Sequence, residues 1–65
     1  MELFLNGEKI KTIAETLDQL IDEKGFDAEG LIVELNIRVI KKQDWGKTFL
    51  NQDDRIECVT FVGGG

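Results

Sequence analysis

The hydrophobic period of the chain changes at Thr12, and this change limits the folds that the chain can adopt. Before it, apolar and polar side chains alternate with period two, as in a strand with one buried face. From Thr12 to Gly25 apolar residues recur at helical spacing, and strand-like segments follow. One amphipathic helix among strands covers one face of one sheet. We therefore expect an α+β roll whose second sheet face is open.

The first part of the chain predicts a hairpin followed by the helix. In the stretch MELFLNGEKIKT, Asn6 and Gly7 both tolerate positive φ and are typical of a type I′ turn between two short strands. The helix is expected over about residues 13–24. Thr12 and the glutamate three residues later match a capping box at its start, and Gly25 suits a left-handed cap at its end. The expected buried stripe comprises Ile13, Leu17, Leu20 and Ile21.

The rest of the chain predicts three more strands and a short turn. Residues 31–36 and 38–41 form a strand pair with Asn36 at the turn. The segment around Trp45 is too polar for a long strand and predicts a single helical turn in which the tryptophan packs. The last strand directs Ile56, Cys58, Thr60 and Val62 to one face. We expect one domain over residues 1–62, with a mixed sheet of four to five strands and one main helix.

Size and composition argue against several classes of function. A chain of 65 residues has one modest core and no room for an enclosed active site, which argues against an enzyme. With no histidine and Cys58 as its one cysteine, the chain lacks the ligands of a zinc or iron site, and we expect no bound cofactor. A formal charge of -5 disfavours nucleic acid and anionic membranes and favours a basic protein partner. No segment resembles a membrane helix or signal peptide, so a cytoplasmic location is expected.

Two groups of residues in the last third of the chain suggest chemistry but have simpler structural interpretations. Cys58 lies in mid-strand on the expected core face with no histidine to activate it, so packing is favoured over a nucleophile. Asp53 and Asp54, with Glu57 nearby, resemble paired carboxylates, but aspartates at such positions are typical of turns.

Strand alternation also directs a set of apolar side chains to the face away from the helix. A contiguous exposed apolar patch on a small domain usually marks a partner site, and aromatic residues are typical of interfaces. The alternative is partial burial of these side chains under neighbouring loops. The predicted docking patch consists of Phe4, Ile32, Val59 and Phe61.

The chain ends in three glycines, residues 63–65, which have no side chain to pack. A phosphate-binding loop is disfavoured, because no helix follows and no lysine is placed for it. We expect a flexible tail that spans roughly 10 Å and threads a narrow channel of another protein. Its end is the α-carboxylate of Gly65, which is ionised at neutral pH and can attack the α-phosphate of ATP. The alternative is a flexible end or a cloning scar without function.

The chain resembles the ThiS family of small ubiquitin-like sulfur carriers of thiamine biosynthesis. The resemblance runs from residue 2 to residue 65 and lies in the segments LFLNGE, TIAETLDQL, VELN, KKQDW and DDRIECVTFVGGG. It implies a β-grasp fold with the last strand central in the sheet. Many members have glycine after the asparagine that corresponds to Asn36, where this chain has Ile37. Many also have a proline-arginine pair near Lys41 and Lys42, which this chain lacks, and a glycine-aspartate turn at its Asp53-Asp54.

The resemblance also implies a mechanism and a set of partners. A ThiF-type adenylating enzyme would activate Gly65 with ATP and magnesium, and a cysteine desulfurase route would deliver sulfur to form a thiocarboxylate. Thiazole synthase, ThiG, would then take that sulfur, and Gly63 and Gly64 would thread the partner active sites. Two alternatives remain open. The chain could serve another acceptor, such as molybdopterin or protein lysines, or be a plain interaction module.

Overall fold

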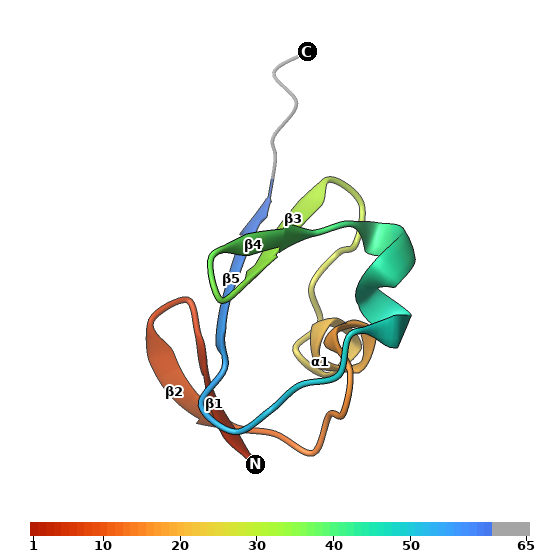
Figure 1. Ribbon diagram of the computed structural model, residues 1–65. Helices are drawn as coiled ribbons and strands as arrows, with labels where there is room; N and C mark the ends of the chain where they lie inside the picture. The colour runs from red at the N-terminus through yellow and green to blue at the C-terminus, as the bar shows by residue number, and fades with distance from the viewer. Residues whose placement is uncertain (61–65) are drawn as a thin grey trace.

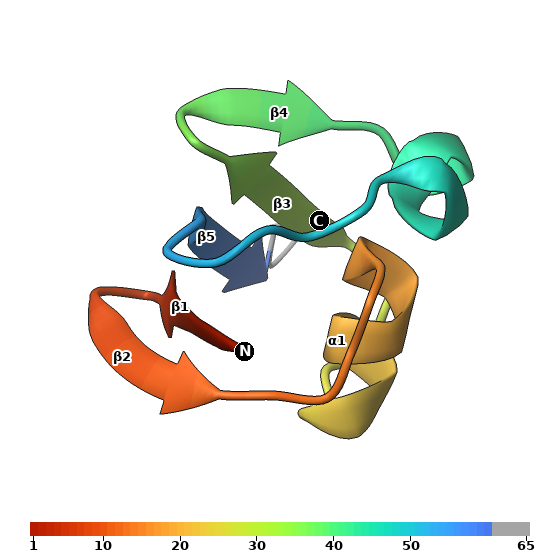
Figure 2. The same ribbon diagram turned by 60° about the horizontal axis from the view of Figure 1, so that its bottom comes forward.

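A computed structural model of the chain describes residues 1–60. Its single sheet has the strand order β2-β1-β5-β3-β4, with β1 and β5 parallel and every other neighbouring pair antiparallel. Figure 2 shows β5 between β1 and β3, in the middle of the sheet. The elements are β1 (Glu2–Leu5), β2 (Glu8–Lys11), α1 (Leu17–Glu23), β3 (Leu31–Leu35), β4 (Arg38–Ile40), the 3-10 helix η1 (Lys42–Lys47) and β5 (Arg55–Thr60). The expected mixed β-grasp roll with a central last strand is confirmed.

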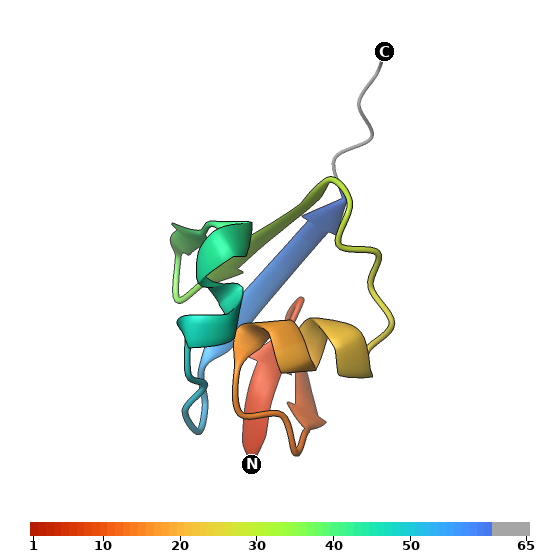
Figure 3. The ribbon, with the colours of Figure 1, turned by 90° about the vertical axis from the view of Figure 1, so that its right-hand side faces the viewer.

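The two helical elements lie on the same side of the sheet (Figures 1 and 3). Strand alternation sends Leu3, Val33 and Ile56 toward them, and all three are almost fully buried. Trp45 of η1 closes the core as expected, and its indole N–H donates to the Ile40 carbonyl at 2.9 Å. The buried core comprises Leu3, Ala14, Leu17, Leu20, Ile21, Leu31, Val33, Trp45, Leu50, Ile56 and Cys58. The opposite sheet face carries no helix in the part of the chain that the structure describes.

The start of the helix differs from the prediction. α1 begins at Leu17 after Thr16, and the predicted capping box at Thr12 does not form. Instead, the Thr12 hydroxyl accepts from the Ala14 N–H at 3.0 Å and donates to the Glu23 carboxylate at the far end of α1. A threonine side chain that bonds locally to the backbone offers an alternative to the helix. Ile13, expected in the buried stripe, is 94% exposed for this reason.

The end of the helix agrees with the prediction. Gly25 has φ +73°, in the left-handed region, and its N–H donates to the Asp22 carbonyl at 3.1 Å. The Phe26 N–H donates to the Ile21 carbonyl, also at 3.1 Å. This pair of bonds is the Schellman motif, which satisfies carbonyls that a helix end otherwise leaves free.

Both hairpins close through two-residue turns with positive φ at each position. Asn6 and Gly7 have φ 51° and 83°, which confirms the predicted type I′ turn. Asn36 and Ile37 have φ 50° and 74°, so the second turn places a β-branched residue where L side chains are strained. Within residues 1–60, no helix is long and apolar enough to cross a membrane.

Candidate functional site

The open sheet face carries the predicted docking patch, and strand pairing fixes which side chains share this face. In the antiparallel pair of β3 and β5, Ile32 stands opposite Val59 and Glu34 stands opposite Glu57. In the pair of β3 and β4, Val39 stands opposite Glu34. Side chains directly opposite each other point to the same face. The face therefore combines three aliphatic side chains with two carboxylates.

The structure brings together two members of the predicted docking patch. Ile32 and Val59 are register partners, with 42% and 58% of their surfaces exposed. Phe61 lies outside the described residues. The burial of Phe4 is intermediate, and this side chain lies beside Arg55 in the parallel pair of β1 and β5. Because Arg55 and Val59 are four residues apart on one strand, Phe4 is separated from the aliphatic pair by about 13 Å.

Two cations cover the Phe4 ring. The Arg55 guanidinium lies 4.5 Å from the ring centroid, and the Lys9 ammonium lies 5.9 Å from it. Such cation–π contacts hold a charged group over an aromatic face. At this end of the sheet the open face is therefore aromatic and basic, whereas at the Val59 end it is aliphatic and acidic. A docking role for the four predicted residues stays a prediction.

Val39 and the two glutamates were not predicted as site residues. Val39 is 64% exposed, although it belongs to the strand that was expected there. The turn at Asn36 could have predicted that Val39 points to the open face, because a two-residue turn fixes the register of a hairpin. Nothing in the sequence predicts that Glu34 faces Glu57, since these residues lie on strands that no hairpin connects.

The aspartates before β5 have the structural role that was expected. Asp53 has φ 68° in a turn. Asp54 is buried, and its two carboxylate oxygens accept from the Asn36 amide at 2.9 Å and from the Asn51 N–H at 2.7 Å. One oxygen of Asp54 therefore holds the β3–β4 turn against the start of β5, and the other closes the loop before β5.

Cys58 is a core residue. Its side chain shares a face with its register partner Val33, and the residue is 9% exposed. Burial, with a smaller contribution from the negative charge of Glu57, raises the pKa of the Cys58 thiol to about 11. At neutral pH the group is a protonated thiol rather than a thiolate, which confirms the packing interpretation.

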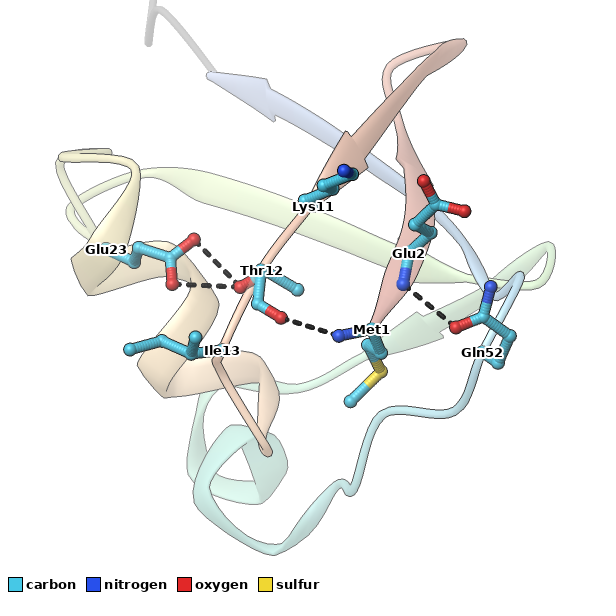
Figure 4. A pocket seen from close by; sticks show the side chains of 7 residues that line it. All are labelled: Met1, Glu2, Lys11, Thr12, Ile13, Glu23 and Gln52. Atoms are coloured by element: carbon cyan, nitrogen blue, oxygen red, sulfur yellow. Dashed lines mark hydrogen bonds between the residues drawn. The ribbon is translucent and has the colours of Figure 1, made fainter.

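A hollow of about 530 Å³ lies beside the N-terminus, and hydrogen bonds that hold the fold together join the residues that line it (Figure 4). The Met1 ammonium donates to the Thr12 carbonyl at 2.9 Å, and the Glu2 N–H donates to the side-chain oxygen of Gln52, also at 2.9 Å. The Thr12 hydroxyl binds Glu23 across the same hollow. These bonds tie the N-terminus to the helix end and to the loop before β5.

The central strand leads directly to the C-terminal glycines. Gly65 follows Thr60 by five residues and can lie at most about 18 Å from it. Residues 63–65, the predicted tail, lie outside the described part of the chain. β1 pairs with the first two residues of β5, and β3 pairs with β5 from Ile56 to Thr60, so Thr60 is held by β3 at the end of the central strand.

The chain was compared with protein families, solved structures and known sequences. The model of the ThiS family matches residues 3–65. The crystal structure of a thiamine biosynthesis protein (ThiS) from Geobacter metallireducens superposes with a TM-score of 0.85 at 32% identity, and the match covers 100% of both chains. The chain is also 41% identical to a thiazole synthase from Magnetococcus marinus and 35% identical to one from Paramagnetospirillum magneticum. It matches these two proteins over its full length but spans 20% of theirs.

Proposed function

The chain belongs to the ThiS family of sulfur carriers, and from this we propose that Gly65 carries sulfur as a thiocarboxylate for the thiazole ring of thiamine. The observation that carries the proposal is that the family match extends through residue 65, so it includes the terminal glycine itself. The position of β5 is consistent with the proposal, because Gly65 follows by five residues a strand that is paired along its length with β3.

The proposed chemistry takes place at the terminal carboxylate. In the active site of a ThiF-type enzyme, which supplies ATP and magnesium, a Gly65 oxygen attacks the α-phosphate and pyrophosphate leaves. The product is an acyl-adenylate, a mixed anhydride. A cysteine desulfurase route delivers sulfur as a persulfide, and a thiol reductant releases it as hydrosulfide while two thiols become a disulfide. The hydrosulfide then attacks the carbonyl carbon and displaces AMP. The thiocarboxylate that results is the sulfur donor for thiazole synthase.

The carrier itself is proposed to act as a co-substrate rather than an enzyme. Cys58 is a buried thiol with a raised pKa, and both Asp54 oxygens are used in the fold. The remaining reactive group in this scheme is the carboxylate at the chain end, and the partners supply its activation. The two related thiazole synthases contain a segment similar to this chain, which supports a partnership between carrier and synthase.

Docking is proposed to use the open sheet face. Ile32 and Val59 are the aliphatic residues of the predicted patch and are register partners on this face, and Phe61 and Phe4 are its other residues. Because Val59 precedes Gly65 by six residues, a protein that encloses the tail would also contact this end of the face.

Mass spectrometry of the intact chain tests the proposal. The chain is incubated with a ThiF-type enzyme, ATP, magnesium and a sulfur source, and we expect a mass increase that equals the exchange of one oxygen for one sulfur. A chain that lacks Gly64 and Gly65 is the control and should stay unchanged. A full-length chain whose C-terminus never gains sulfur under these conditions would contradict the proposed function.

A further inference from the structure

Two glutamates stand side by side on the open face without a cation between them. Glu34 of β3 and Glu57 of β5 are register partners in an antiparallel pair, where opposite side chains have Cβ atoms about 4.5–5.5 Å apart. Like charges placed directly opposite each other destabilise a sheet. Within residues 1–60 the ion pairs join Lys9 to Glu2, Lys24 to Glu23 and Lys47 to Asp44, so none involves these two glutamates.

The arginines of β4 and β5 are directed elsewhere. Arg55 precedes Glu57 by two positions and shares its face, but its guanidinium lies over the Phe4 ring. Arg38 stands opposite Leu35, which places it on the other face of the sheet from Glu34. Within residues 1–60, no ion pair therefore compensates the repulsion between the two carboxylates.

Exposed aliphatic side chains surround the two carboxylates. Ile32 and Val59 form the next outward-facing pair along β3 and β5, and Val39 lies beside Glu34 on β4. Each of the three is more than 40% exposed. We call these five residues the glutamate patch: Ile32, Glu34, Val39, Glu57 and Val59. Exposed aliphatic side chains mark a surface that a partner can cover, and the two carboxylates favour a partner of opposite charge.

We propose that Glu34 and Glu57 together bind one arginine side chain of the adenylating enzyme that acts on Gly65. The three aliphatic residues pack around this arginine. The inference rests on the proposed function and names the chemistry of the partner. A guanidinium is planar, has five N–H donors and remains charged, so it can donate to two neighbouring carboxylates at once. A lysine ammonium is a more strongly hydrated point charge and is less suited to burial in an aliphatic rim.

The position of the patch favours this partner over others. Gly65 follows Val59 by six positions and lies within about 18 Å of Thr60. A protein whose active site holds Gly65 therefore comes close to the glutamate patch. Its cation would convert the repulsion of the free chain into attraction in the complex. The formal charge of -5 of the whole chain adds to this preference for a basic surface.

The test replaces each glutamate by an isosteric neutral residue, in the variants Glu34→Gln and Glu57→Gln. Binding to a ThiF-type adenylating enzyme is measured by calorimetry at low and high salt, and the melting temperature of each free variant is recorded. Glu8→Gln is the matched control, because Glu8 is exposed on edge strand β2 and forms no ion pair within residues 1–60. It changes the net charge by the same amount.

We expect both patch variants to bind at least about tenfold more weakly than the wild type, with a smaller salt dependence. Their melting temperatures should equal or exceed that of the wild type, because the repulsion is removed. The control should bind as the wild type does. Affinities for the two patch variants that match those of Glu8→Gln would overturn the inference, as would a lower melting temperature that accounts for the lost binding.

Sulfur transfer to the wild-type chain separates this inference from the proposed function. If the wild type gains sulfur but the patch variants bind normally, only the arginine contact is wrong. If the wild type binds but never gains sulfur, the proposed function is wrong. Sedimentation of the free chain addresses a further occupant: self-association that is lost in Glu57→Gln would assign the patch to a second copy and overturn the inference.

Discussion

The side-chain oxygen of Asn6 accepts a hydrogen bond of 2.8 Å from the backbone N–H of Cys58, across a sequence separation of 52 residues. β1 ends at Leu5, so beyond this point no strand backbone of the hairpin faces that N–H. The Asn6 N–H also donates to the Ile56 carbonyl at 2.8 Å. One turn residue therefore continues the parallel pairing and locks the first hairpin to the central strand.

Replacing Asn6 by glycine should separate its two roles. Glycine keeps the positive φ that the turn requires but removes the acceptor for the Cys58 N–H. We expect Asn6→Gly to lower the free energy of unfolding by about 1–2 kcal/mol, as measured by urea denaturation. Amide exchange at Cys58 should accelerate. Asn6→Asp keeps an acceptor oxygen and should be closer to the wild type, and equal stability of all three proteins would refute this role.

The second hairpin turn predicts a stabilising substitution. Ile37 is 91% exposed with φ 74°, so its side chain gains little from packing while its backbone is strained. We expect Ile37→Gly to raise the melting temperature, with a gain of about 1 kcal/mol after the entropy of the unfolded glycine is subtracted. Asn36→Gly in the same turn should destabilise, because the Asn36 amide binds Asp54 and accepts from the Arg55 N–H. If the two substitutions change the melting temperature equally, backbone strain at Ile37 and the hydrogen bonds of Asn36 do not explain the stability of this turn.

The elements that the sequence predicts well are those with local causes. The Asn6-Gly7 turn and the Gly25 cap depend on residues that tolerate positive φ, and both form as expected. The start of the helix depends on a tertiary contact instead. Thr12 donates to Glu23, eleven residues away, and this bond competes with the predicted capping box. No local sequence pattern could indicate that Thr12 bonds to Glu23 instead of capping the helix.

The same distinction applies to the candidate site. Alternation was sufficient to place Ile32 and Val59 on the open face, because the direction of a side chain depends on its own strand. Which residues become neighbours depends on register between strands that are distant in sequence. The contacts of Phe4 with Arg55 and of Glu34 with Glu57 are of this second kind, and only the folded sheet shows them.

The buried thiol predicts a loss of stability at alkaline pH. The pKa of Cys58 is raised from its ordinary value of 9.0 to about 11 in the fold, so the unfolded chain loses this proton first. The stability that depends on the protonated Cys58 thiol is fully present below pH 9 and is lost as pH rises toward 11. The free energy of unfolding falls in this window by at most about 1.4 kcal/mol per pH unit. Denaturation of wild type and Cys58→Ala across this window measures the difference. A constant difference between the two proteins would refute it.

The terminal glycines predict a complete separation of function from folding. The core that stabilises the chain lies between Leu3 and Cys58, and glycines have no side chain to add to it. Removal of Gly64 and Gly65 should therefore leave the melting temperature nearly unchanged while it abolishes sulfur transfer. The measurement is growth without thiamine of a strain that lacks its own thiazole sulfur carrier, which also distinguishes thiamine from other sulfur acceptors. Gly65→Ala keeps the carboxylate but adds a Cβ, so it should support slower growth if the tail threads a narrow channel. A truncated chain that restores full growth would show that the glycines are incidental and that the chain is a plain interaction module.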